Sequence, residues 1–286
     1  MSHKITPFIR CVDNAQQVAE YYGSIFPDAK IIKSNPVVVD MEIFGQSIAM
    51  LNGGSNDGAT LTPAISFSLW IRDLDLTKEI WDKLSDGGTV MMAYDAYPRS
   101  KAYGRCNDKF GVSRQVMYDD GEGRTTHKLI PSLMFIGAND GKAKEAMSKY
   151  ISIFPASNQG AIHTYGDMGG PDKPDHIAHA EFTLVNQLFI AMDSWLDHKF
   201  NFTDGISLAI SCADQSEIDM YREKLALDGG SEGQCGRCKD RYGVSRQIFP
   251  VRLPDALFQE DKVKADFAMQ AMMKMNKIVI SDLYPM

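Results

Sequence analysis

Residues 103–116 read YGRCNDKFGVSRQV, and residues 235–248 read CGRCKDRYGVSRQI. Nine of the fourteen positions are identical, which chance does not produce. Shorter matches precede both stretches in the same order: SIFP at 24–27 and 152–155, IAM at 48–50 and 190–192, and IS at 65–66 and 206–207. The chain therefore contains two copies of one fold, and each further feature is compared between the two copies.

A polar, glycine-containing stretch without hydrophobic periodicity, residues 119–126, separates the two copies, as expected of a linker. We divide the chain into a first domain at residues 1–122, a linker at 123–127 and a second domain at 128–286. The second domain ends in a helical tail.

Each copy follows the same order of elements. Apolar residues at helical spacing predict a helix over residues 18–26, with Asn14 as a candidate N-terminal cap, and another over 143–154. Three short strand-like runs follow the first helix, at 30–33, 37–44 and 47–51. Each copy then adds a strand, a second helix and three more strands, which predicts an α+β fold.

The strand predicted over residues 64–71 has two different faces. Ser66, Ser68 and Trp70 share one face, and aliphatic and aromatic residues fill the other. The run at 206–212 repeats this pattern with Ser207. If helices cover the apolar face, we expect the sheet to curve so that its other face forms a cup lined by polar side chains.

The composition favours a folded globular protein, with 44% apolar and 23% charged residues. The formal charge of −7 disfavours nucleic acid and anionic lipid as partners, and no apolar run approaches the ~20 residues that cross a bilayer. The start of the sequence lacks the features of an export signal. The five cysteines are an odd number spread over a long chain, which is not the pattern of a disulfide-stabilised secreted protein. We therefore expect a cytoplasmic protein with reduced thiols and no membrane or nucleic-acid partner.

Several short motifs resemble one known family. They are Thr6-Pro7-Phe8, Gln46 with IAM at 48–50, DKFGVS at 108–113 and AMMKM at 271–275. The chain resembles the PhnB-like branch of the vicinal oxygen chelate superfamily, which includes glyoxalases, bleomycin-resistance proteins and extradiol dioxygenases. The resemblance implies two glyoxalase-like domains, each of paired βαβββ modules that form a curved mixed sheet cup. Many PhnB-like members have no assigned activity, so the resemblance leaves the activity, and whether the protein is an enzyme, open.

Some relatives carry the label demethylubiquinone methyltransferase. The sequence has no glycine-rich strand-to-helix loop that would suit a nucleoside cofactor. We therefore expect no such cofactor.

The resemblance also implies where a metal ion would bind, because metal-dependent members use two histidines and a glutamate on the cup floor. Hydroxyls, a neutral amide or an aliphatic side chain stand at the corresponding positions, so we expect no metal and no cofactor there. The counterparts are Thr6, Ser66 and Gln115 in the first copy and Ile130, Ser207 and Gln247 in the second.

We expect the cups to bind a small organic molecule. Gln115 and Gln247 are equally compatible with orienting this ligand and with hydrogen-bonding only to the surrounding structure. The residues expected to line the cups are Thr6, Phe8, Ser66, Ser68, Trp70, Gln115, His179, Ser207 and Gln247.

Two alternative functions remain open. His176 and His179 are three residues apart on a predicted strand, so they point to opposite faces and do not share one ion. His179 and Glu181 could serve as displaced ligands of a metal-dependent lyase or dioxygenase. The protein could also sequester a drug-like molecule without changing it.

The remaining features have structural interpretations. We expect Asp108 and Asp240 in turns, Arg114 and Arg246 at the surface or in an interface, and Cys235 and Cys238 in a hairpin. The tail at residues 261–277 has a methionine-rich helical stripe. This stripe would either cap the core or form a homodimer.

Overall fold

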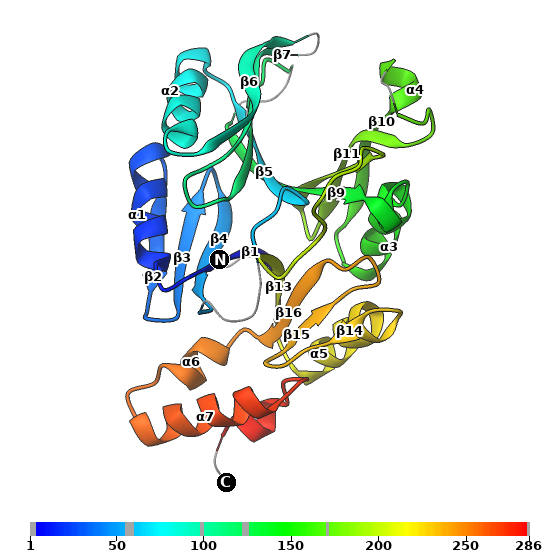
Figure 1. The fold of residues 1–286 in the computed structure, drawn as a ribbon. Helices are drawn as coiled ribbons and strands as arrows, with labels where there is room; N and C mark the ends of the chain where they lie inside the picture. Colours follow the sequence, from blue (N-terminus) through cyan, green and yellow to red (C-terminus); the bar gives the residue numbers. More distant parts are fainter. Residues whose placement is uncertain (1–3, 55–59, 98–99, 122–125, 170–171, 285–286) are drawn as a thin grey trace. The chain divides into compact units, whose positions relative to one another are not determined.

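A computed structural model describes residues 4–54, 60–97, 100–121, 126–169 and 172–284. The chain divides into a larger unit, residues 7–206, and a smaller unit formed by the residues up to Thr6 together with 207–286. Figure 1 shows the elements of both. No helix in the described ranges is long and apolar enough to span a membrane.

The larger unit contains an eight-stranded mixed sheet in the order β10-β11-β12-β9-β5-β8-β7-β6. At its centre β5 and β9 run antiparallel, with Ser66 opposite Ser132. The strands are β5 (Ile65–Ile71), β6 (Thr89–Tyr97), β7 (Ser100–Asn107), β8 (Ser113–Tyr118), β9 (Lys128–Ile136), β10 (Asn158–Thr164), β11 (Ile177–Leu184) and β12 (Gln187–Ser194).

This sheet takes one βαβββ module from each sequence copy. Strands β5 to β8 precede residue 122 and strands β9 to β12 follow residue 128, so strand pairing crosses the division that the sequence suggests. The first strand of each module would otherwise leave unpaired backbone groups along one edge, and the β5–β9 pair removes both edges. Residues 123–125 of the expected linker lie outside the described residues.

The other strands form two groups of four. In the larger unit the order is β1-β4-β3-β2, and in the smaller unit it is β14-β15-β16-β13. Their bounds are β1 (Ile5–Cys11, in the larger unit from Pro7), β2 (Lys30–Ser34), β3 (Val38–Ile43), β4 (Gln46–Asn52), β13 (Ile206–Cys212), β14 (Ser231–Glu232), β15 (Arg237–Lys239) and β16 (Ser245–Pro250).

Helices α1, α2, α3, α5 and α7 appear where apolar periodicity predicts helices, whereas α4 and α6 were not predicted. In the larger unit α2 packs against β5, β7 and β8, and α3 packs against β11 and β12. This unit has α1 (Ala15–Ile25), α2 (Leu74–Ser85), η1 (Gly137–Asn139), α3 (Ala143–Ile153) and α4 (Tyr165–Met168). The smaller unit has α5 (Gln215–Arg222), η2 (Glu223–Leu227), α6 (Leu253–Leu257), α7 (Lys262–Lys274) and η3 (Ile280–Leu283).

Asn14 occupies the predicted N-cap position of α1, but its side chain does not cap the helix. The Asn14 side chain makes no capping hydrogen bond, and the first helical amide, Ala15 N, donates instead to Asn52 Oδ1 at 2.9 Å. Helix α3 uses the same arrangement, because Ala143 N donates to Asp193 Oδ1 at 3.0 Å. In both copies a side chain at the end of a neighbouring strand satisfies an amide that has no partner within its helix.

The surface position predicted for Arg114 is also wrong, because its side chain is fully buried. Arg114 lies 3.3 Å from Asp108 Oδ2, and its guanidinium carbon is 4.5 Å from the ring centroid of Tyr22. The Tyr22 hydroxyl donates to the same oxygen at 2.8 Å. A flat guanidinium can be buried when a carboxylate and an aromatic face surround it.

Asp108 is the turn residue that the sequence predicts and also the partner of the buried arginine. Its Oδ1 accepts hydrogen bonds from the backbone amides of Phe110 and Val112, each at 3.0 Å. The second copy repeats the arrangement with Asp240, and the buried Arg246 lies 2.9 Å from Asp240 Oδ2. The prediction of a surface position for Arg246 therefore fails for the same reason.

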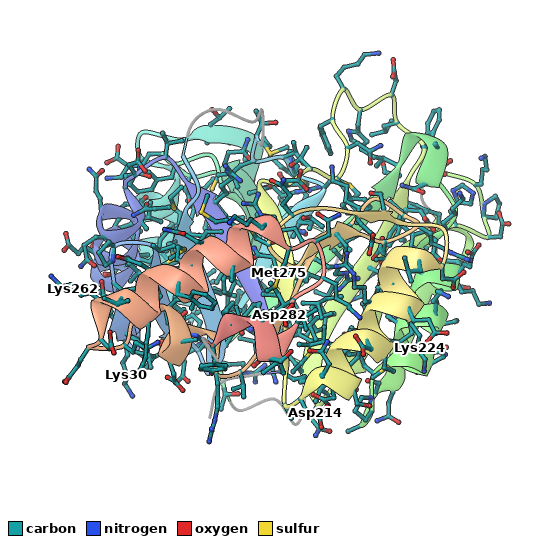
Figure 2. All side chains as sticks on the ribbon, turned by 90° about the horizontal axis from the view of Figure 1, so that it is seen from below. Lys30, Asp214, Lys224, Lys262, Met275 and Asp282 are labelled. Atoms are coloured by element: carbon teal, nitrogen blue, oxygen red, sulfur yellow. The ribbon has the colours of Figure 1, made fainter. Side chains whose placement is uncertain are left out.

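The tail helix is confirmed as α7. It begins at the labelled Lys262 and ends before Met275 in the view of Figure 2. Ala268 is its buried residue, whereas Val263, Phe267 and Met273 remain exposed.

Candidate functional site

The candidate site is the face of the eight-stranded sheet that carries Ser66, Ser68 and Trp70 of β5, which we name the cup face. Helix α2 lies on the other side of the sheet, because a Cβ at Gly104 of β7 would meet the ring of Trp81 in α2 at 2.7 Å. Residues paired in register lie on the same face of a sheet. Pairing therefore adds side chains from β7, β8, β9, β11 and β12 to the cup face.

A chain of hydrogen bonds runs across one part of the cup face. Gln115 pairs in register with Ser68, and its Nε2 donates to Ser66 Oγ at 2.9 Å. The hydroxyl of Tyr103 donates to Gln115 Oε1 at 3.0 Å. Burial raises the pKa of Tyr103, so the phenol stays protonated and can donate.

An apolar cluster forms the middle of the cup face. Trp70, Ile130 and Ile190 are buried together, from β5, β9 and β12. The partly buried side chains packed against them are Met117, Leu188 and Met192. The centre therefore offers aromatic and aliphatic surface beside the hydrogen-bonded side chains.

Two ionisable residues of β11 lie beside this cluster. His179 stacks on Trp70 with ring centroids 6.3 Å apart, and its Nε2 is 3.5 Å from Glu181 Oε1. The ring of His163 on β10 is 6.5 Å from that of His179. This group lies across the apolar cluster from Gln115.

Arg105 is a cup-face residue that the sequence reasoning missed. It pairs in register with Gln115, and its Nε is buried without a hydrogen-bond partner among the described residues. Burial, and secondly the charge of Arg105, lowers the pKa of His198. Strand alternation from Tyr103 would have placed Arg105 on this face.

The structure divides the predicted ligand residues among three places. The group gathered on the cup face consists of Ser66, Ser68, Trp70, Gln115 and His179.

The other predicted ligand residues lie elsewhere. In the smaller unit, Gln247 Nε2 donates to Ser207 Oγ at 2.8 Å, which repeats the Gln115–Ser66 pair. Thr6 and Phe8 lie on the partly buried face of β1. Only the first group can therefore be interpreted together with a complete sheet face.

The positions corresponding to the superfamily's metal ligands do not fit a divalent cation. Ile130, which the sequence analysis grouped with Ser207 and Gln247, lies opposite Ser68 in register. Its side chain has no donor atom, and both ends of the Gln115 amide are hydrogen-bonded. Neutral oxygens and an aliphatic side chain offer no anionic ligand to a transition metal.

The prediction that His176 and His179 lie on opposite faces of one strand is not met, because His176 lies before β11. His179 lies on the cup face, whereas His176 precedes β11 and is 3.0 Å from Asp140 and 3.2 Å from Asp172. The two imidazoles therefore belong to separate clusters.

Comparison with solved structures supports the fold. Glyoxalase I from Zea mays is 12% identical, with a TM-score of 0.54 over 85% of this chain and 90% of that one. A putative 3-demethylubiquinone-9 3-methyltransferase, the PhnB protein from Bacillus cereus, is 26% identical over 41% of this chain and 100% of that one, with a TM-score of 0.39. Among curated proteins, none matches the chain.

The sequence model of one protein family matches most of the chain. This family is described as 3-demethylubiquinone-9 3-methyltransferase, and it matches residues 3–117 and 127–249, one segment in each copy. The chain therefore belongs to this family, as two tandem copies, and shares its fold with glyoxalase I.

Proposed function

We propose that the cup face binds a small organic anion through hydrogen bonds and apolar contact, without chelation by a metal. The observation that carries this proposal is Arg105, whose buried Nε lacks a hydrogen-bond partner among the described residues. Leaving a buried donor unsatisfied costs about 1–3 kcal/mol. A carboxylate of the ligand would accept this hydrogen bond and offset the positive charge.

The side chains next to Arg105 support a ligand that is polar at one end. Tyr103 donates to Gln115, and Gln115 donates to Ser66. A serine hydroxyl that accepts one hydrogen bond still has its own proton to donate. Ser66 can therefore donate to an oxygen of the ligand while the amide holds the serine in place.

The centre of the cup face supports an apolar remainder of the ligand. Trp70, Ile130 and Ile190 provide adjacent aromatic and aliphatic surface, and binding sites for small molecules typically combine such surface with a few fixed polar groups. An aromatic carboxylate matches both the cation and the tryptophan.

Benzoate and benzamide test this proposal on the full-length protein, because they share a ring and differ in charge. We expect benzoate to bind about tenfold more tightly, since a hydrogen bond to a charged group contributes roughly 1.5 kcal/mol or more. Calorimetry gives the affinities, and quenching of tryptophan fluorescence that Trp70→Phe removes locates the ligand.

Arg105→Ala should abolish the preference for benzoate. Arg237→Ala is the matched control, because Arg237 takes the place of Arg105 in the second copy, and it should leave the preference unchanged. Equal affinities of the wild-type protein for the two compounds, or a preference that survives Arg105→Ala, would contradict the proposal.

A second candidate is a metal-dependent lyase or dioxygenase. The observation that favours it is the proximity of His179 and Glu181, whose Nε2 and Oε1 atoms are 3.5 Å apart on the cup face. Stoichiometric iron, nickel, manganese or zinc that His179→Ala removes from the purified protein would support this candidate. Metal content unchanged by His179→Ala would exclude these displaced ligands.

Binding without conversion would resemble a sequestering protein. The Tyr103–Gln115–Ser66 chain contains no ionised base, which favours binding over turnover. Incubating benzoate with stoichiometric protein and following it by chromatography distinguishes the two: a constant concentration supports sequestration, and a steady loss supports catalysis.

We propose a homodimer formed through α7. Val263 is 80% exposed, Met273 is 60% exposed and Phe267 is 43% exposed on this helix, and apolar side chains gathered on one element often mark an interaction surface. Sedimentation over a concentration series should give twice the mass of one chain for the wild type and a lower mass for Phe267→Glu. A mass that stays near one chain would overturn the dimer.

We propose a cytoplasmic location. The cysteines Cys11, Cys106, Cys212, Cys235 and Cys238 are free thiols, which suits a reducing compartment. Fractionation of cells that express the full chain tests the location, and recovery outside the cytoplasm would contradict it.

A further inference from the structure

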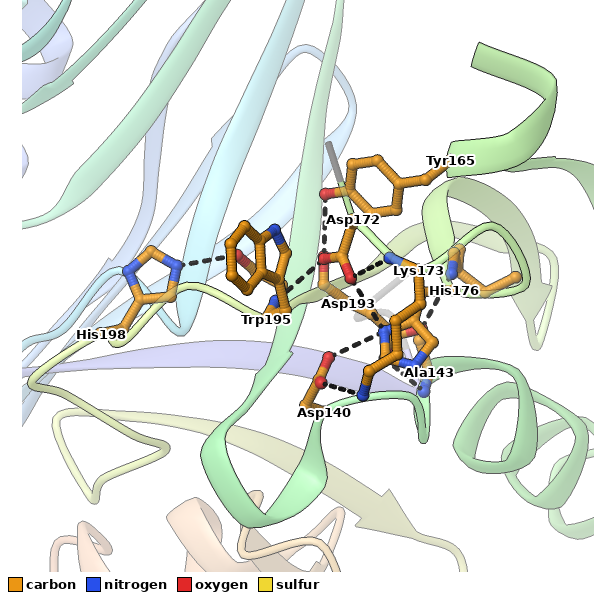
Figure 3. A network of polar contacts seen from close by, with 11 residues as sticks. Asp140, Ala143, Tyr165, Asp172, Lys173, His176, Asp193, Trp195 and His198 are labelled. Atoms are coloured by element: carbon orange, nitrogen blue, oxygen red, sulfur yellow. Dashed lines mark hydrogen bonds and ion pairs between the residues drawn. The ribbon is translucent and has the colours of Figure 1, made fainter. Parts of the chain in front are cut away.

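Three side chains outside the cup face converge at the start of β11. His176 Nδ1 lies 3.0 Å from Asp140 Oδ1 and 3.2 Å from Asp172 Oδ1. One ligand atom from each residue lies within 4.8 Å of the other two. Figure 3 shows the three side chains together with the polar groups around them.

The imidazole nitrogen in this cluster is buried without a hydrogen-bond partner among the described residues. His176 Nδ1 and Asp140 Oδ1 are both buried, and neither makes a hydrogen bond to the described residues. The side chain of His176 is only 9% exposed. Because the short contacts to the carboxylates lack hydrogen-bond geometry, the nitrogen is not aimed at either oxygen alone. Buried polar atoms without a partner are rare, so an unidentified group is expected between these atoms.

The spacing of the three atoms fits a metal ion of ordinary size. Zinc binds imidazole nitrogen and carboxylate oxygen at about 2.0–2.2 Å. Two ligands of a tetrahedral zinc ion at these distances are about 3.3–3.6 Å apart. The separations measured from His176 Nδ1, 3.0 and 3.2 Å, are slightly shorter, so an ion would move these side chains apart by a few tenths of an ångström.

The surrounding backbone holds two of the three side chains in place. Asp172 accepts hydrogen bonds from the amides of Lys173 at 2.6 Å and Trp195 at 2.9 Å. A Cβ at Gly141 would lie 2.9 Å from His176 Nε2, so glycine leaves room for the imidazole. Such outer contacts orient metal ligands before an ion arrives.

The charges near the cluster favour a cation. Asp193 is buried close by, and its carboxylate accepts the amides of Ala143 and Ile177. Lys173 reaches Asp140 Oδ2 at 3.3 Å, but its side chain is 64% exposed, so solvent screens it.

We propose that Asp140, Asp172 and His176 bind a divalent transition-metal ion of the zinc type. One imidazole and two carboxylates suit such an ion better than Ca²⁺, which prefers six to eight oxygen ligands. The ion would fasten the segment between β10 and β11 to the turn that precedes α3, and water would complete its coordination.

The test uses full-length protein stripped of metal and titrated with Zn²⁺ against a chromophoric chelator. The background is Cys235→Ser, because the partly exposed thiol of Cys235 could bind zinc by itself. We expect one Zn²⁺ per chain, weak competition by Ca²⁺ and a melting temperature that rises with added Zn²⁺.

His176→Ala and Asp140→Asn should each weaken Zn²⁺ binding by more than about tenfold, since loss of an outer-shell partner alone costs 10–100-fold. Asp140→Asn preserves the shape of a partly exposed side chain and so guards against a folding defect. His179→Ala is the matched control, because it removes an imidazole of the same strand region from the cup face, and it should leave the affinity unchanged.

Two results would overturn the proposal. The first is the absence of stoichiometric Zn²⁺ binding, which would leave the cluster as direct polar contacts between His176 and its two aspartates. The second is binding that His179→Ala abolishes while Asp140→Asn leaves it intact, which would place the ion on the cup face.

Discussion

The first modules of the two copies, residues 7–52 and 128–194, share a fold but differ in their connections. Both contain an eleven-residue helix after the first strand, and both satisfy its first amide from a strand end. Residues 35–37 connect β2 to β3, whereas residues 165–176 connect β10 to β11 and include Asp172 and His176. The two modules therefore share the way in which the first helical amide is satisfied. They differ in the loop between their second and third strands, and functional residues commonly lie in loops.

The residue that satisfies the helix amide also differs between the modules. Asn52 is neutral and Asp193 is a carboxylate that additionally accepts the amide of Ile177. This exchange adds negative charge only where the Asp140–Asp172–His176 cluster lies. The comparison therefore predicts which substitutions will act equally in both copies and which will not.

The largest expected effect concerns a feature that the copies share, the buried aspartate–arginine pair. Asp108→Ala and Asp240→Ala should each lower the free energy of unfolding by about 3–5 kcal/mol, because each leaves a buried guanidinium without its carboxylate. Urea-induced unfolding measures this. Asp82→Ala, in an exposed pair with Lys78, is the control and should cost at most about 1 kcal/mol. Equal losses for Asp108→Ala and Asp82→Ala would contradict the buried role.

The next effect concerns the residue that differs at the helix start. Asp193→Ala should cost about 2–4 kcal/mol, because two backbone amides lose a charged acceptor. Asn52→Ala should cost about 1 kcal/mol, as other capping substitutions do. Hydrogen exchange at the amides of Ala143 and Ala15 locates the loss. Similar costs for both variants would show that the negative charge adds nothing.

A smaller effect concerns the cup face, where Tyr103 in one copy corresponds to Cys235 in the other. Tyr103→Phe removes the hydrogen bond to Gln115 Oε1 and should cost about 0.5–1.5 kcal/mol in unfolding free energy. Cys235→Ser should change stability by less than about 0.5 kcal/mol, since the side chain is partly exposed. A larger loss of unfolding free energy for Cys235→Ser than for Tyr103→Phe would contradict this prediction.

The smallest effect per residue concerns alkaline pH. Burial raises the pKa of Cys11 to about 12 and that of Cys238 to about 11, from an ordinary 9.0. The unfolded chain therefore loses these protons first, and stability falls as the pH rises from about 9 toward 11 or 12. Cys238→Ala should reduce this slope by a fraction of the ~1.4 kcal/mol per pH unit that one proton contributes.

The alkaline measurement requires a reductant and a matched variant. Cys235→Ser is the control for a partly exposed cysteine, and it should change the slope less than Cys238→Ala does. Unfolding at several pH values under reducing conditions gives the slopes. A slope that is the same in the wild type and in Cys238→Ala would contradict the role of this thiol.

Local patterns were sufficient to predict much of the site. Alternation in β5 placed Ser66, Ser68 and Trp70 on one face, and the repeat paired Gln115 with Ser66 in the same way as Gln247 with Ser207. The contribution of Arg105 was missed, although it lies two residues from Tyr103 on the same strand face. The Asp140–Asp172–His176 cluster could not be predicted, because its members come from two loops whose approach depends on packing.

The sequence by itself determined the two copies, most of their helices and strands and the polar faces of β5 and β13, because these follow from residue spacing along the chain. Only the tertiary structure decided that β5 pairs with β9, since an open strand edge accepts any partner with suitable length and faces. It also decided that Arg114 is buried and that His176 meets two aspartates. Both the burial of Arg114 and the approach of His176 to the aspartates depend on contacts between residues distant in sequence. Local periodicity does not encode such contacts.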